Sequence, residues 1–139
     1  MADVSISLNM KKKSGSGTFP PSGYTACQNN ANYAYKYSGG NFDNGKGFEF
    51  TKESPPGAAK VVEINLIGSG NVTYSVASAQ IHYAVSPPTS ADVTSSVSGN
   101  TITITDSDLH VESGTFDVTV NDTTNNVNGL QCDPRWQNK

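Results

Sequence analysis

The sequence predicts an all-β protein, and three observations lead to that class. Apolar and polar residues alternate with a period of two in several short stretches. Clusters of Gly, Asn, Ser and Pro separate these stretches at intervals of roughly 8–12 residues. Hydrophobic residues make up only 35% of the 139 residues, and Ser, Thr, Asn and Gly stand where strong helix formers would be expected. We therefore expect one antiparallel β-sandwich domain over residues 1–139, immunoglobulin-like or a small barrel, with about seven or eight strands.

The first predicted strand lies near the N-terminus, where Val4, Ile6, Leu8 and Met10 alternate with polar residues. This pattern is typical of a half-buried strand. The basic run that follows, residues 11–13, leads into Ser-Gly-Ser-Gly. We interpret it as a solvated turn rather than a phosphate or lipid contact.

A region rich in Tyr, Asn and Gly follows, from Ser22 to Gly47. Tyr33, Tyr35 and Tyr37 share one face of a predicted strand there. If the three rings point outward, they form a stacking platform for a sugar or a peptide. If they point inward, they belong to the core, and the alternation with Ala34 and Lys36 makes this the simpler pattern.

The remaining strand signals run from the middle of the chain to residue 122. The segment 61–67 carries apolar residues on most of both faces, so we expect a central strand. The next long apolar segment is interrupted by Ala77-Ser78-Ala79, which predicts a bend or a bulge. The predicted strands after residue 46 cover residues 47–51, 61–67, 72–76, 81–85, 93–97, 101–105 and 115–122.

Charge and hydropathy restrict the classes of partner that we expect for this protein. A net charge of -3 argues against nucleic-acid binding, and no apolar run approaches the ~20 residues of a membrane helix. No signal peptide is visible, so we expect a cytoplasmic protein, or a secreted one whose signal peptide has been removed. No cofactor or metal site is predicted. Cys27 and Cys132 are either free thiols or a disulfide that would restrict the unfolded chain by roughly 4–5 kcal/mol.

The C-terminal segment holds the only Trp of the chain, Trp136, close to Asp133 and Pro134. A large apolar side chain near a chain end is expected to pack, so Trp136 would fix residues 127–139 as a docked tail. We add Trp136 to the three tyrosines as a candidate binding residue.

The tail CDPRWQNK resembles the Asp-Pro signature of the DP-EP family, small bacterial β-proteins. The resemblance covers roughly the second half of the chain, and its distinctive element is Asp133-Pro134 with Asn138. It implies a β-barrel or a sandwich, and it implies that Asp133 is an acidic catalytic residue, because one branch of the family is described as a self-cleaving aspartic peptidase. That chemistry needs a second carboxylate, supplied by a symmetric dimer or by the body of the domain.

Two functional hypotheses follow. The first is a binding or assembly module, a homodimer, whose region Ser22 to Gly47 contacts a protein or a carbohydrate. The second is an autoprocessing aspartic peptidase of the DP-EP type that uses Asp133.

Overall fold

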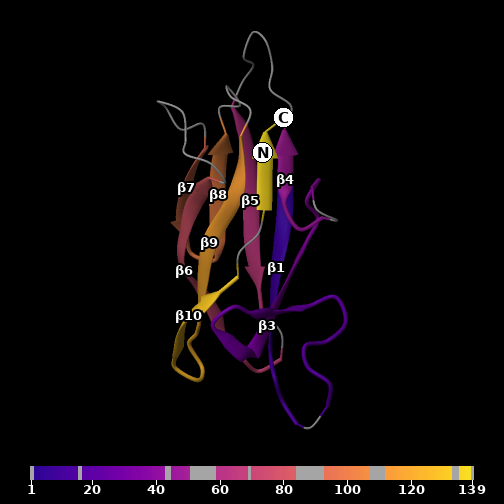
Figure 1. Cartoon of the computed structure of the whole chain (residues 1–139). Helices are drawn as coiled ribbons and strands as arrows, with labels where there is room; N and C mark the ends of the chain where they lie inside the picture. The colour runs from indigo at the N-terminus through magenta and orange to yellow at the C-terminus, as the bar shows by residue number, and fades with distance from the viewer. Residues whose placement is uncertain are drawn as a thin grey trace.

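The computed structural model describes residues 2–15, 17–42, 45–50, 59–68, 70–83, 93–106, 112–132 and 135–138, and this part of the chain contains strands and no helix. Two packed sheets confirm the predicted all-β sandwich (Figure 1). The strands are β1 (Val4–Lys12), β2 (Thr25–Cys27), β3 (Asn30–Ser38), β4 (Phe48–Phe50), β5 (Lys60–Ile67), β6 (Tyr74–Tyr83), β7 (Val93–Ser98), β8 (Thr101–Asp106), β9 (Glu112–Asp122), β10 (Val127–Gln131) and β11 (Arg135–Asn138).

The first sheet contains six strands in the order β2-β3-β1-β5-β8-β7. The prediction that β5 is central is confirmed, because β5 pairs with β1 on one side and with β8 on the other. β7 and β8, both predicted as strands, form a hairpin in which Ser98 pairs with Thr101. Gly99, in the connection, has a φ of 60°, which a side chain would disfavour.

The second sheet is organised around β9. β6 pairs with one edge of β9 over nearly its whole length. β10 and β11 share the other edge: β10 pairs with residues 119–122, and β11 pairs with residues 112–115. The Cys132 amide donates a hydrogen bond to the Val118 carbonyl between them, at 2.9 Å. β11 also pairs with β4, so the described backbone of the C-terminal segment is built into this sheet.

The predicted interruption in β6 is confirmed as a bulge. Val76 pairs with Val120 and Ser78 pairs with Thr119, which leaves Ala77 as the extra residue. Two residues therefore face one on the partner strand, as in a β-bulge.

Two features of the predicted fold were wrong. The described residues form eleven strands, more than the seven or eight expected, because β2, β10 and β11 are too short to show a period of two. The sandwich is also not purely antiparallel, because β1 pairs with β5 in parallel and β11 pairs with β4 in parallel. The pairing direction depends on the path of the connections, which local alternation does not reveal.

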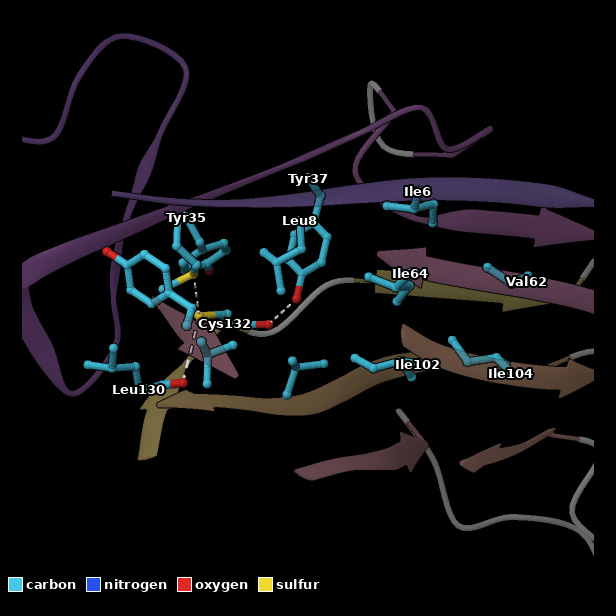
Figure 2. Close-up of a cluster of buried hydrophobic side chains, with 14 of the residues drawn as sticks. Ile6, Leu8, Tyr35, Tyr37, Val62, Ile64, Ile102, Ile104, Leu130 and Cys132 are labelled. Atoms are coloured by element: carbon cyan, nitrogen blue, oxygen red, sulfur yellow. Dashed lines mark hydrogen bonds between the residues drawn. The ribbon is translucent and has the colours of Figure 1, made fainter. Parts of the chain in front are cut away.

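The core lies between the two sheets and changes in character along its length (Figure 2). At one end it is built from branched aliphatic side chains that are almost fully buried, which we call the aliphatic end: Ile6, Val62, Ile64, Ile102 and Ile104. At the other end phenols, thiols and a carboxylate are buried, which we call the polar end: Cys27, Tyr33, Tyr74, Asp122 and Cys132.

The tyrosine row of β3 belongs to this core. Tyr33, Tyr35 and Tyr37 are 2%, 8% and 4% exposed, so the inward alternative is the one that the structure supports. The rings of Tyr35 and Tyr37 pack edge to face, with centroids 5.7 Å apart.

Candidate functional site

Polar loops and strand ends converge around the end of β1. Lys11 and Lys12 are the last residues of β1 rather than part of a turn, so that interpretation of the basic run was wrong for these two residues. Lys12 pairs with Tyr33 of β3, which places the lysines beside the start of β3. We call the resulting surface the lysine–asparagine surface; it consists of Lys11, Lys12, Lys13, Asn30, Asn32, Asn71, Thr124 and Asn125.

Two adjoining hollows form this surface. The first has a volume of about 570 Å³ and lies between the lysines, the loop before β6 and the β9–β10 turn. The second has a volume of about 510 Å³ and lies between the lysines, the start of β3 and the same turn. Lys12, Lys13 and Asn125 line both hollows, so the two hollows adjoin and share part of their walls.

Hydrogen bonds hold the converging segments together. The Thr123 amide donates to the Thr73 carbonyl at 2.9 Å. The Thr73 amide in turn donates to the Thr124 hydroxyl at 2.9 Å, which ties the β9–β10 turn to the loop before β6. The Lys13 amide donates to the Asn32 carbonyl at 2.7 Å, which ties the end of β1 to β3. The surface is therefore supported by contacts between segments that are distant in the sequence.

A buried carboxylate supports the surface from below. Asp122 is fully buried. It accepts a hydrogen bond from the Tyr33 hydroxyl at 2.6 Å. It also accepts hydrogen bonds from the Asn125 amide at 2.9 Å and from the Asn125 side chain at 2.8 Å. Because Tyr33 and Asn125 both line the second hollow, Asp122 fixes the position of two of its walls.

The buried groups have shifted pKa values. Burial raises the pKa of Asp122, but hydrogen bonds from Tyr33, Asn125 and the Thr124 backbone together bring it below its ordinary value. Burial, followed by the hydrogen bond to Asp122 and its charge, raises the pKa of Tyr33. Burial and the charge of Asp122 raise the pKa of Tyr74 to about 12. At neutral pH the polar end therefore holds one carboxylate and two neutral phenols.

The side chains of Lys12 and Lys13 are available to a ligand, whereas the Lys11 ammonium group lies over the Tyr24 ring, 4.9 Å from its centroid. Among the residues that the structure describes, no carboxylate forms an ion pair with Lys12 or Lys13, and both residues are exposed. The only described aromatic residue that lines either hollow is Tyr33, whose ring is buried. The site therefore offers positive charge and amide groups, and no exposed ring for stacking.

Of the three predicted tyrosines, only Tyr33 reaches this surface. Tyr35 and Tyr37 lie in the core, so the outward platform that the stacking hypothesis required is not formed. Tyr33 is also buried but reaches the wall of the second hollow. Within the region Ser22 to Gly47, Asn30 and Asn32 are the other residues that line a hollow.

The predictions for the C-terminal segment are only partly covered by the described residues. Asp133 and Pro134 lie outside them, and so does the side chain of Trp136. The catalytic role of Asp133 and the binding role of Trp136 therefore stay predictions, as does the homodimer. The described residues contain no group of three His, Cys, Asp or Glu side chains placed to hold a metal ion.

Sequence analysis missed the lysine–asparagine surface. The basic run was the one visible signal, because it is the only cluster of three positive residues in the chain. Asn71, Thr124 and Asn125 carry no signal that would connect them with that run. They meet it only because the fold places the loop before β6 and the β9–β10 turn beside the end of β1.

No protein-family model matches the chain, and a search of curated proteins finds no match. The relationship to the DP-EP family therefore stays a prediction. In the part of the chain that the structure describes, no helix has the length and hydrophobicity needed to cross a membrane.

Proposed function

We propose that this protein is a β-sandwich binding module whose ligand is an acidic carbohydrate, held by the lysine–asparagine surface. The observation that carries the proposal is the convergence of three consecutive lysines and several amide side chains on two joined hollows. A carboxylated sugar combines the two features that such a surface complements, a negative charge and closely spaced hydroxyl groups.

Charge supports an anionic ligand. The ammonium groups of Lys12 and Lys13 have no carboxylate partner among the described residues, although the chain as a whole has a net charge of -3. The carboxylate beneath them, Asp122, is fully buried and already accepts hydrogen bonds from Tyr33 and Asn125. An incoming anion would therefore meet local positive charge on a protein that is negative overall.

Size and hydrogen-bonding capacity support a polyhydroxylated ligand. Volumes of about 570 and 510 Å³ fall within the range of small-ligand sites. The side-chain amides of Asn30, Asn32, Asn71 and Asn125 each offer a donor and an acceptor, and Thr124 adds a hydroxyl. A neutral sugar is less well matched, because neither hollow presents an exposed aromatic ring among the described residues.

Calorimetric titration tests this function with an oligogalacturonate as the acidic probe and a malto-oligosaccharide of equal length as the neutral one. We expect the uronate to bind and the neutral glucan to bind much more weakly. Lys12→Gln should weaken uronate binding by about fivefold, since an exposed ion pair contributes up to about 1 kcal/mol. Affinity should also fall as salt is raised from 50 to 300 mM, because exposed charges are screened.

Lys46→Gln is the matched control, because Lys46 is exposed and lies outside both hollows. It removes the same charge, so it should leave the affinity unchanged within about twofold. Equal binding of the charged and neutral probes would contradict the proposal, as would equal effects of the two lysine variants.

A further inference from the structure

Two thiols from distant parts of the sequence meet in the polar end of the core. Cys27, at the end of β2, and Cys132, directly after β10, are separated by 105 residues in the chain, and their Sγ atoms lie 3.7 Å apart. Neither cysteine is in a disulfide and both are buried, with Cys132 fully enclosed. The Sδ atom of Met10 lies 3.7 Å from the Sγ atom of Cys132.

The backbone around the two thiols is held together independently of them. The Asn29 side chain donates to the Gly129 carbonyl at 2.7 Å and accepts from the Gln131 amide at 3.0 Å. The Gln28 amide donates to the Gln131 carbonyl at 3.4 Å. These bonds join the residues that follow Cys27 to the residues that precede Cys132. The proximity of the two sulfurs therefore comes from a bonded interface between two segments.

We propose that Cys27 and Cys132 are a redox-active pair that forms a reversible intramolecular disulfide, fastening the end of β2 to the segment between β10 and β11. A disulfide places its sulfurs about 2.05 Å apart, so closure requires the two Sγ atoms to approach by roughly 1.7 Å. Rotation of the two cysteine side chains supplies such a movement while the Cys132 amide stays bonded to the Val118 carbonyl.

The reaction balances with a disulfide as oxidant, and oxidised glutathione serves as the probe. One cysteine thiolate attacks a glutathione sulfur and expels one glutathione thiolate. The second cysteine thiolate then attacks the cysteine sulfur of the mixed disulfide and expels the second glutathione thiolate. Two protein thiols lose their hydrogens as protons and two electrons pass to glutathione, which leaves as two thiols.

Cys27 is the better first nucleophile. It is 4% exposed, whereas Cys132 is fully buried. The hydrogen bond with the Cys132 thiol lowers the pKa of Cys27, against the opposing effect of burial. Attack by Cys27 leaves Cys132 as the resolving thiol, already within 3.7 Å.

The burial of both thiols also determines the stage at which the disulfide can form. Glutathione cannot reach either sulfur in the closed sandwich, so exchange requires the tail to separate from β2, or it precedes docking during folding. The formed bond would be equally protected from reductant. The proposed disulfide does not depend on the proposed carbohydrate site. Asn30 and Val127, which line the second hollow, lie near the two segments that the disulfide would join.

The experiment refolds the full chain in oxidised or in reduced glutathione and then alkylates all free thiols under denaturing conditions. We expect the oxidised sample to lose two hydrogens, to take up no alkylating agent, and to yield one peptide in which Cys27 is joined to Cys132. Its melting temperature should exceed that of the reduced sample by about 10 °C, because a link across so long a loop strongly restricts the unfolded chain.

Cys27→Ser and Cys132→Ser are the matched variants, and each should abolish the difference between the two samples. Should either variant fail to fold, the comparison within the wild-type chain still decides. Two alkylated cysteines after oxidative refolding would overturn the proposal. A stable glutathione adduct or a disulfide between two chains would overturn it equally.

Discussion

The aliphatic end and the polar end of the core are stabilised by different kinds of interaction. At the aliphatic end, Ile64 on β5 faces Ile102 on β8 in register, and both side chains are about 1% exposed. At the polar end, Tyr33 on β3 reaches Asp122 on β9 across the interior, in a hydrogen bond of 2.6 Å. The Ile64–Ile102 contact needs only apolar side chains of suitable size, whereas Tyr33 and Asp122 need each other at a specific distance.

This difference separates stability from function. Apolar burial is not directional, so the aliphatic end stabilises the sandwich without fixing the position of any surface group. Hydrogen bonds to the Asp122 carboxylate are directional, and two of its donors, Tyr33 and Asn125, line the second hollow. Changes at the aliphatic end should therefore affect stability alone, and changes at the polar end should affect stability and the surface together.

The largest effect should come from the aliphatic end. Ile104→Ala is expected to lower the free energy of unfolding by about 3–4 kcal/mol, because Ile104 is fully buried and its removal leaves a cavity. Urea unfolding measures the loss. Thr105→Ala on the exposed face of the same strand is the control and should change stability by less than about 1 kcal/mol. Similar losses in both variants would contradict the assigned orientation of β8.

A smaller and pH-dependent effect should come from the polar end. Asp122→Asn is expected to cost about 2 kcal/mol at pH 7, because hydrogen bonds to a charged acceptor are stronger than those to a neutral one. The folded pKa of Asp122 is below its ordinary value of 3.8, so the carboxylate contributes stability above that value. The contribution is lost as pH falls through the folded pKa.

Chemical unfolding of wild type and Asp122→Asn across pH 2–7 tests the direction of this pH dependence. The difference between them should be constant above about pH 5 and should shrink as the pH is lowered below 3.8. Uronate binding by the variant should also weaken at pH 7, since Asn125 loses its charged acceptor. A stability difference that grows toward low pH would disprove the assigned role of the carboxylate.

The smallest effect is expected where the two ends meet. The Tyr37 hydroxyl donates a hydrogen bond to the Cys132 carbonyl (Figure 2). Tyr37→Phe keeps the ring and leaves this carbonyl without that donor, so we expect a loss of about 1 kcal/mol in urea unfolding. Tyr24→Phe, on a half-buried ring, is the comparison and should lose less. An unchanged free energy of unfolding in Tyr37→Phe would show that this hydrogen bond contributes nothing to docking of the tail.

The sequence predicted the aliphatic end well, because the signal there is local. Alternation identified β1, β5, β8 and β9, and the structure buries Ile102, Ile104, Val118 and Val120 of the last two strands. The Ala-Ser-Ala interruption at residues 77–79 identified the bulge in β6. Each of these features depends on residues that are neighbours in the chain.

The lysine–asparagine surface could not be predicted in the same way, because its members are brought together from four segments. Lys12 meets Tyr33 through strand pairing, and Thr124 reaches Thr73 through a hydrogen bond between loops. The contact between Cys27 and Cys132 also joins distant parts of the chain. The sequence allowed a disulfide between them but could not show the distance between their sulfur atoms. Such contacts depend on the order and direction of the strands, including the parallel pairs.

Amide chemical-shift mapping with the oligogalacturonate tests the central claim most directly, because it locates the ligand on the folded chain. The account predicts that the largest changes fall on residues 11–13, 30–32, 71 and 124–125 and that they saturate together. Changes centred on Asp3 and Lys60, at the opposite end of the sandwich, would contradict it. No change at any residue up to millimolar uronate would contradict it as well.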